Sequence, residues 1–463
     1  MRIKEEIVSL KAMTEKVAEI PSKIRFKIKT EYFLYLLVLL IPFQQRLYKF
    51  FRPFSLSLID PKWNVPQYFE IHLDGFISDF VLLGLILCSF RWRSFWEKEN
   101  KYLTLFLVFA LASIVNSDFA LYPIPYWRWL HLALPALLFF LVSRTPLEEG
   151  SFKKIAKLTL AVALVESVIA IVQYFVQHSL GLKGLGEQTL IAKNYLAAHF
   201  PMADGSIWIF DRFFHGVREN AFVLRASGTL THPNILGGFI VFTLLMTYYL
   251  YGQSLKRGLL SVAIFVQTFC LFITYSRAAI FTAALTTLVW IVMTSFREKK
   301  LSSLIWVSAG SALLCLTLLY PQIFHRGGIV SYNVVAQSSD VLRMTVADVG
   351  LAMFKAHPFL GIGFNNYMLA FPHFAKDIPA TYIHNVYLHL GVEVGLFGTL
   401  SFLAFALLVF IRGWKSRHRP EVLTGLCIFT ALLLIGLADF YPLCQQEIRL
   451  IFFLAAGLIL RSS

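Results

Sequence analysis

The residues best placed for acid–base chemistry surround His384, in the segment YIHNVYLHLGVEVGLFG. This histidine opens a long apolar stretch, so we expect it at the start of a helix. The positive end of a helix favours neutral imidazole over imidazolium, and the neutral ring is the form that accepts a proton from a hydroxyl group. His384 is therefore a candidate general base; the alternative is a histidine that only caps its helix. His389 falls on a different helix face and is expected to be structural.

Arg277 lies in the segment TYSRAAI, between two apolar stretches joined by almost no loop. A guanidinium group at such an apolar boundary is unfavourable unless it has a partner. The N-terminus of a helix adds partial positive charge, and the two together suit an anion such as pyrophosphate. The alternative is an arginine whose side chain only reaches the lipid headgroups.

Arg343 is expected on an amphipathic helix, because apolar residues recur around it at helical spacing. These residues are Leu342, Val346, Val349 and Met353. The alternative role for Arg343 is a surface ion pair with Asp340 or Asp348, which would contribute little. The Gly-x-Gly turn at residues 361–363 is too common a pattern to indicate nucleotide binding.

Arg225 lies in the segment RASGTLTHPN, just before another apolar stretch. Pro233 and Asn234 are both residues that commonly begin a helix, so we expect the helix to start there. Arg225 would then be a further cation close to the boundary of the apolar stretch.

The sequence shows no HExxH motif, no paired cysteines and no clustered carboxylates of the kind that bind metals, although it contains twelve histidines. The five cysteines are scattered, without CxxC spacing. We therefore expect neither a dedicated metal site nor a cofactor.

The elements that position these residues are apolar. Hydrophobic residues make up 57% of the chain and charged residues only 15%, whereas soluble domains contain roughly 45–50% and 25%. The net charge of +15 does not indicate a nucleic-acid partner, because the basic residues are dispersed between apolar stretches instead of forming one patch. The composition predicts an integral membrane protein in contact with membrane lipids.

Twelve apolar stretches have lengths near the roughly 20 residues that cross a bilayer. They lie near residues 31–45, 76–92, 102–116, 125–143, 155–176, 234–251, 259–275, 278–296, 303–320, 385–411, 421–439 and 448–461. We predict an all-α protein with about twelve transmembrane helices. Two connections, residues 177–233 and 321–383, are long, and long loops in a compact protein are often functional.

The distribution of Lys and Arg predicts the orientation. With a cytoplasmic N-terminus, 26 of the 42 basic residues fall in cytoplasmic segments, although the outward segments are longer. Both termini are then cytoplasmic, and the two long loops are periplasmic. Residues 1–30 carry eight Lys or Arg among apolar residues and are predicted to form a basic amphipathic segment on the membrane surface, ahead of one transmembrane domain at residues 31–463.

Four segments, in order, resemble the O-antigen ligase and polymerase superfamily of bacterial membrane glycosyltransferases. They are GTLTHPNILGG, TYSRAAI, the DVLRM helix with HPFLGIGFNNY, and YIHNVYLHLGVEVGLFG, and together they span roughly residues 225–400. The order of the segments is more specific than any one of them. The resemblance implies a GT-C-like fold in the bacterial inner membrane, with an active site that faces the periplasm.

The resemblance also implies the substrates and the roles of the residues. Arg277 and Arg343 would bind the pyrophosphate of an undecaprenyl-pyrophosphate-linked glycan, with Arg225 as a further phosphate partner. His384 would activate the acceptor hydroxyl, without a metal and with inversion at the anomeric carbon. The acceptor would be the lipid A-core oligosaccharide.

Two alternatives stay open. An O-antigen polymerase shares the same order of motifs, so the sequence separates it poorly from a ligase. A flippase or transporter of lipid-linked glycans would need ionisable residues within the bundle. Glu166, Glu393 and Asp439 are the candidates. We favour the ligase.

Overall fold

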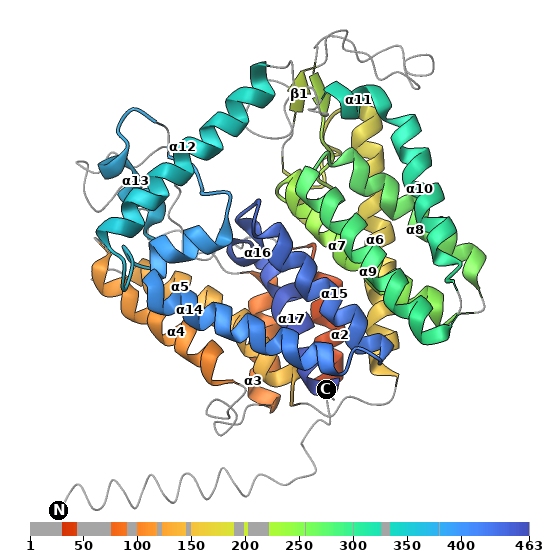
Figure 1. The fold of residues 1–463 in the computed structure, drawn as a ribbon, viewed down its shortest axis with the longest axis horizontal. Coiled ribbons are helices and arrows are strands. Elements are labelled where there is room, and N and C mark those ends of the chain that lie inside the picture. The colour runs from red at the N-terminus through yellow and green to blue at the C-terminus, as the bar shows by residue number, and fades with distance from the viewer. Residues whose placement is uncertain are drawn as a thin grey trace, which may run out of the picture.

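The computed structural model describes residues 30–43, 76–89, 100–117, 123–144, 150–188, 199–201, 222–254, 256–299, 301–325, 334–378 and 380–462. These residues form a helical bundle with one short antiparallel pair of strands (Figure 1). The basic N-terminal segment predicted for residues 1–30 lies outside the described residues, apart from Thr30.

Each of the twelve apolar stretches coincides with a helix. These are α2 (Thr30–Leu40), α3 (Ile77–Ser89), α4 (Lys101–Ser113), α5 (Pro123–Val142), α6 (Ser151–Val176), α7 (Pro233–Gly252), α8 (Arg257–Ile273), α9 (Arg277–Glu298), α10 (Leu304–Leu318), α14 (Val386–Lys415), α15 (Pro420–Ile435) and α17 (Gln446–Ser462). The remaining elements are η4 (Ile114–Asn116), η5 (Lys183–Leu185), β1 (His199–Pro201), β2 (Phe222–Leu224), α11 (Tyr320–His325), α12 (Val334–Ala356), α13 (Tyr367–Phe374) and α16 (Tyr441–Cys444). The predicted helical class is confirmed.

Five of these helices are each long and apolar enough to cross a bilayer, judged by length and composition. They are α5, α6, α7, α9 and α14. This number supports a multi-pass membrane protein. The total of twelve spans and the cytoplasmic location of both termini stay predictions.

Helix α7 lies at the centre of the bundle. Its sequence is apolar on all sides, which is typical of a helix buried on every face, and each residue from Pro233 to Tyr251 is buried. It packs against α6, α8, α9 and α15. Helix α17 packs against α5 and α15, while α14 packs against α4 (Figure 1). The first turn of α7 is therefore held firmly from several sides.

Helix α14 is interrupted at Gly395, where the backbone has φ 68° and ψ −171°. A Cβ atom at this position would lie 2.2 Å from the carbonyl oxygen of Phe359, so the close approach requires glycine. The N–H of Ile362 donates to the carbonyl oxygen of Val392, at 2.9 Å. The Gly-x-Gly turn at residues 361–363 thus packs against the break in α14, which the sequence predicted as one continuous helix.

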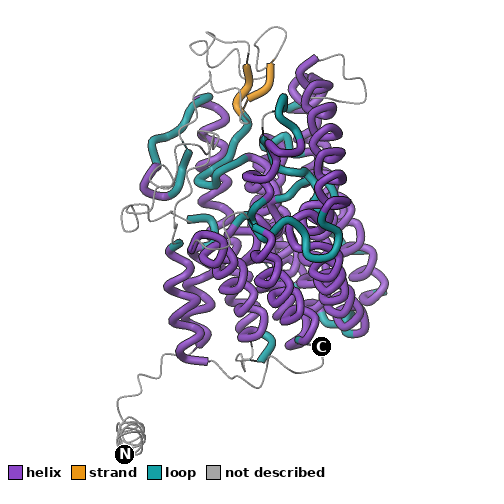
Figure 2. Tube along the Cα trace, turned by 90° about the vertical axis from the view of Figure 1, so that its left-hand side faces the viewer, coloured by secondary structure: helices purple, strands orange, loops and turns teal. Residues whose placement is uncertain are grey.

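The two long connections contain structure of their own. Residues 177–233 contain η5 and the strand pair, in which Phe200 faces Val223, and residues 321–383 contain α12 and α13. The predicted amphipathic helix is confirmed as α12, with Val346 1% and Met353 0% exposed, although Leu342 is 38% exposed. The strand pair lies at the end of the bundle far from the C-terminus (Figure 2), which we call the site end.

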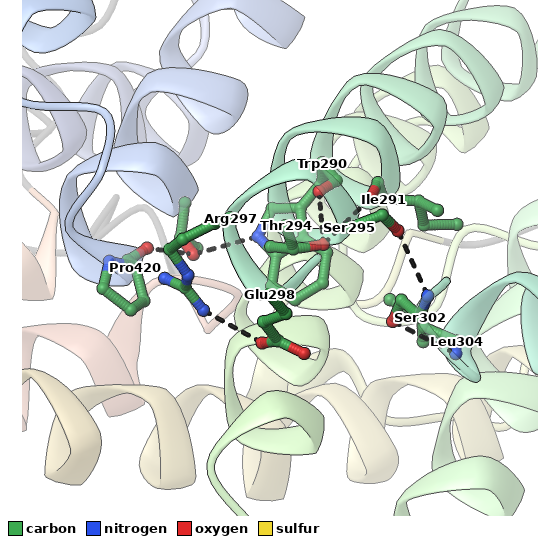
Figure 3. A network of polar contacts seen from close by, with 10 residues as sticks. Trp290, Ile291, Thr294, Ser295, Arg297, Glu298, Ser302, Leu304 and Pro420 are labelled. Carbon is green, nitrogen blue, oxygen red and sulfur yellow. Dashed lines mark hydrogen bonds and ion pairs between the residues drawn. The ribbon is translucent and has the colours of Figure 1, made fainter. Parts of the chain in front are cut away.

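The opposite end of the bundle is fixed by polar contacts between the C-terminal turns of α9 and its neighbours (Figure 3). The indole N–H of Trp290 donates to Oγ1 of Thr424 on α15, at 3.3 Å. The backbone N–H of Ser302, in the turn before α10, donates to Oγ of Ser295, at 3.1 Å. Because α9 is anchored here, its N-terminal residue Arg277 is held in a defined position at the site end.

Candidate functional site

His384 and Asp439 form a hydrogen-bonded pair at the site end. His384 Nδ1 lies 3.2 Å from Oδ1 of Asp439. The imidazole is 26% exposed and the carboxylate 4% exposed, so the ring lies between bulk solvent and a buried anion. A carboxylate on Nδ1 fixes the tautomer with the proton on that atom and leaves the lone pair on Nε2. This arrangement suits a general base.

Contacts between the start of α14 and the end of α15 bring the two residues together. The N–H of Val386 donates to the carbonyl oxygen of Gly436, at 2.8 Å. The side-chain amide of Asn385 donates to the carbonyl oxygen of Leu437, at 3.1 Å. Asn385 is also the N-cap of α14, because its Oδ1 accepts the N–H of Leu388 at 2.9 Å. The helix cap is therefore Asn385 and not His384, so the capping alternative is wrong.

The Asp439 carboxylate has three partners. Besides His384, it accepts a hydrogen bond from Nδ2 of Asn234 at 2.6 Å and one from the N–H of Phe440 at 2.9 Å. Burial by itself raises the pKa of Asp439. The hydrogen bond and charge of His384, the charge of His232 and the Asn234 amide outweigh that effect, and the pKa lies below its ordinary value. Asp439 therefore remains an anion at neutral pH.

The polar contacts continue from Asp439 to Arg225. Oδ1 of Asn234 accepts a hydrogen bond from Nη2 of Arg225, and Nε of Arg225 donates to the carbonyl oxygen of Thr274 at 2.8 Å. Arg225 is only 4% exposed, so it is buried between the start of α7 and the end of α8. Its guanidinium group links the start of α7 to the end of α8, next to Arg277. Its role as a phosphate partner stays a prediction.

Arg277 is the first residue of α9, as predicted, and its side chain is exposed. The start of α9 packs tightly on the first turns of α7. A Cβ atom on Gly237 would lie 2.8 Å from Cβ of Ala279 and 3.2 Å from Cβ of Ser276. Arg277 and Asn234 therefore belong to adjoining helix N-termini, whose partial positive charges add to that of the guanidinium group.

Arg343 lies on α12, half-buried, one turn before Val346. Val346 and Ile383 belong to one small hydrophobic cluster, and a Cβ atom on Gly350 would lie 2.5 Å from Cδ1 of Ile383. The helix that carries Arg343 thus packs on the residue that precedes His384. In the described part of the chain Arg343 has no hydrogen bond or ion pair, so it does not pair with Asp348, and the side chain of Asp340 is not described.

The comparison with known proteins bears on this end of the molecule. Residues 259–403 match the family model described as O-antigen ligase. This match supports the resemblance to the O-antigen ligase/polymerase superfamily that the sequence motifs indicated. A search of curated proteins found no match. The matched segment contains Arg277, Arg343 and His384, whereas Arg225, Asn234 and Asp439 lie outside it and reach the site through the fold.

Sequence reasoning missed two members of the candidate site. Asp439 was considered only as a residue that would serve transport, and Asn234 only as the start of a helix. They are 205 residues apart in the sequence, and Asp439 is 55 residues from His384. The one local signal for Asp439 is an aspartate at the end of an apolar stretch, in LADFYP. In the described residues no group of three or more His, Cys, Asp or Glu side chains is arranged to hold a metal.

Two buried side chains of α6 hold the loop that carries Arg225. Oε1 of Glu166 accepts Oγ1–H of Thr229 at 2.6 Å, and Oε2 accepts the N–H of the same residue at 3.0 Å. Gln173 bonds both the N–H and the carbonyl oxygen of Gly228, at 2.9 and 2.8 Å. Both side chains are 0% exposed. Glu166 was one of the ionisable residues that a transporter would need within the bundle. In the structure its carboxylate holds Thr229 in place.

Replacing Gly228 with alanine is expected to destabilise this loop. Gly228 has φ +62°, and a Cβ atom there would lie 2.3 Å from Oε2 of Glu166. The left-handed backbone and the clash together cost about 2–4 kcal/mol of folding free energy, and the displaced loop should also slow transfer. Gly310→Ala is the matched control, because nothing lies within 4 Å of its Cβ position. Equal melting temperatures and equal transfer rates for the two variants, measured in detergent, would contradict this role of Gly228.

Proposed function

We propose that the protein is an O-antigen ligase. It transfers a glycan from undecaprenyl pyrophosphate to the lipid A-core oligosaccharide on the periplasmic face of the bacterial inner membrane. The observation that carries the proposal is the hydrogen-bonded pair of His384 and Asp439 at the site end, with arginines on the adjoining helices. Residues 259–403 of the same chain match the O-antigen ligase family model.

In the proposed reaction, the acceptor hydroxyl attacks the anomeric carbon of the donor glycan from the face opposite the pyrophosphate. The new C–O bond forms as the bond to the pyrophosphate oxygen breaks, so the configuration is inverted. The hydroxyl proton passes to Nε2 of His384, and Asp439 stabilises the resulting imidazolium ion.

The proposed role of Arg277 and Arg343 is to bind the pyrophosphate as it leaves. Guanidinium groups form charge-assisted, often bidentate hydrogen bonds with phosphate oxygens and stabilise charge that develops on them. Two observations support this role. Arg277 is exposed at a helix N-terminus, and the side chain of Arg343 is half-buried without a protein partner in the described part of the chain. Arg225 is proposed to position Asn234 and, through it, Asp439.

The proposal can be tested with purified protein in vesicles that contain an undecaprenyl-pyrophosphate-linked O-antigen. We expect release of undecaprenyl pyrophosphate only when lipid A-core is added, at a rate that EDTA does not change. A polymerase would instead lengthen the lipid-linked glycan without lipid A-core. Movement of the lipid-linked glycan across the bilayer with neither release nor lengthening would identify a flippase and overturn the proposal.

A further inference from the structure

A cavity of about 130 Å³ lies between α5, α14, α16 and α17. Its walls include the aromatic rings of Trp127, Tyr382 and Phe440. One water molecule needs roughly 10–15 Å³ of such volume, so the cavity holds about ten water-sized groups. A monosaccharide has a similar number of non-hydrogen atoms. The size of the cavity therefore suits one sugar residue.

Three polar side chains on the cavity wall each have an atom without a hydrogen-bond partner among the described residues. His389, Gln446 and Arg449 line the cavity and are 4%, 2% and 8% exposed. No partner among the described residues reaches Nδ1 of His389, Oε1 of Gln446 or Nε of Arg449. Buried polar atoms are usually paired, so these three point to a polar occupant. They include both a donor and an acceptor, and a sugar hydroxyl needs both.

The charges around the cavity compensate one another. Arg449 interacts electrostatically with Asp79 and Glu447, and Arg128 with Glu393. Arg128, Arg449 and Glu393 line the cavity, whereas Asp79 and Glu447 do not. Each arginine on the wall thus has an acidic partner that partly offsets its charge, which reduces the attraction for a pyrophosphate group. A neutral polyhydroxyl ligand between aromatic walls is favoured instead.

The cavity adjoins the His384–Asp439 pair on the side away from Arg225. The ring of Phe440 stacks on that of Tyr382, with a centroid distance of 4.5 Å. It also makes an edge-to-face contact with the His384 ring, with a centroid distance of 5.7 Å. Asp439, the preceding residue, bonds Asn234 of α7. The chain at residues 439–440 therefore separates the cavity from the α7 side of the site, where Arg225 lies.

We propose that this cavity binds one neutral sugar residue of the acceptor glycan, next to the hydroxyl that His384 deprotonates. The proposal rests on the proposed function, because only a transferase has an acceptor glycan. It assigns the α7 and α9 side, with Arg277, to the donor and the α5, α14 and α17 side to the acceptor; Arg343 lies on α12, which packs against α14. His389, which the sequence predicted to be structural, becomes a residue that positions the acceptor sugar.

Direct binding tests the cavity independently of activity. Saturation-transfer NMR on the protein in nanodiscs would use D-glucose, D-galactose and N-acetyl-D-glucosamine as probes. We expect millimolar binding of at least one probe, weakened about tenfold by His389→Phe and by Trp127→Leu, and unaffected by inorganic pyrophosphate. The controls are His373→Phe and Trp306→Leu, at exposed positions on α13 and α10. Absence of binding, displacement by pyrophosphate, or equal binding by cavity and control variants would overturn the proposal.

Transfer kinetics in vesicles separate this proposal from the proposed function. In both cavity variants we expect the KM for lipid A-core to rise about tenfold while the KM for the lipid-linked donor stays unchanged. An unchanged KM for lipid A-core with normal transfer would refute the cavity and leave the ligase intact. Sugar binding that depends on His389, in a protein that releases no undecaprenyl pyrophosphate with any acceptor, would support the cavity and refute the ligase.

Discussion

Replacing His384 with alanine is expected to lower the transfer rate about 10²–10⁴-fold, the usual contribution of a general base. The side chain is 26% exposed, and Asp439 keeps its hydrogen bonds from Asn234 and Phe440, so the protein should still fold. The measurement is release of undecaprenyl pyrophosphate in vesicles at saturating donor and acceptor. Melting temperature in detergent checks the fold.

A second substitution separates base chemistry from hydrogen bonding. In His384→Asn the amide takes the place of Nδ1 and can still donate to Asp439, but it cannot accept a proton from a hydroxyl group. We expect the same loss of transfer as in His384→Ala, with a melting temperature nearer to that of the native protein. His373→Ala, at an exposed position on α13, is the control. If His384→Asn retains a tenth or more of the native rate, His384 is not the general base.

Asp439→Asn is expected to lower transfer by about 10²–10⁴-fold although Asp439 does not contact the reacting atoms. With its carbonyl oxygen kept toward the Asn234 amide, the new side chain presents NH₂ to Nδ1 of His384. Nδ1 must then accept the hydrogen bond, which places the proton on Nε2, where a base needs a lone pair. The expected defect is in kcat, while the KM for the donor changes little.

Two readouts distinguish positioning of His384 from general instability. If Asp439 acts only through His384, the double variant His384→Asn/Asp439→Asn should transfer about as slowly as His384→Asn alone. Independent, multiplicative losses would contradict that coupling.

The second readout is the pH dependence of stability. Because the folded-state pKa of Asp439 lies below its ordinary value, its carboxylate stabilises the fold above about pH 4 and loses that effect at lower pH. The difference in melting temperature between the native protein and Asp439→Asn should therefore shrink as the pH falls below about 4.

The helices were predictable because each is coded by a local apolar stretch. The starts of α9 at Arg277 and of α7 at Pro233 were predictable from short-range signals. The residue types that favour a helix start are found at the N-terminus of the helix itself. The break in α14 did not, because the close approach of Phe359 that requires Gly395 comes from another part of the chain. A lone glycine in an apolar stretch gives no sign of such a contact.

The candidate site was predictable only in part for the same reason. His384 and Arg277 stood out because a charged or titratable side chain beside an apolar stretch is locally unusual. Arg343 stood out because the apolar residues around it recur at helical spacing. Arg225 stood out too, but its burial depends on partners in α7 and at the end of α8. Asp439 gave almost no signal, because its function arises from a residue 55 positions away.

The contact between the start of α14 and the end of α15 has a consequence for how the chain can vary. His384 precedes α14 and Asp439 follows α15, and the two helices run antiparallel, so both residues lie at the same end of the pair. Their contact therefore depends on the two helix lengths being matched. One residue added to α15 would turn its end by about 100° and move it about 1.5 Å along the axis, which would carry the carboxylate away from the imidazole. Insertions should therefore be tolerated in the turn at residues 416–419 and selected against within either helix. The lengths of the two helices are therefore set by the geometry of the reaction, whereas the length of the turn between them is not.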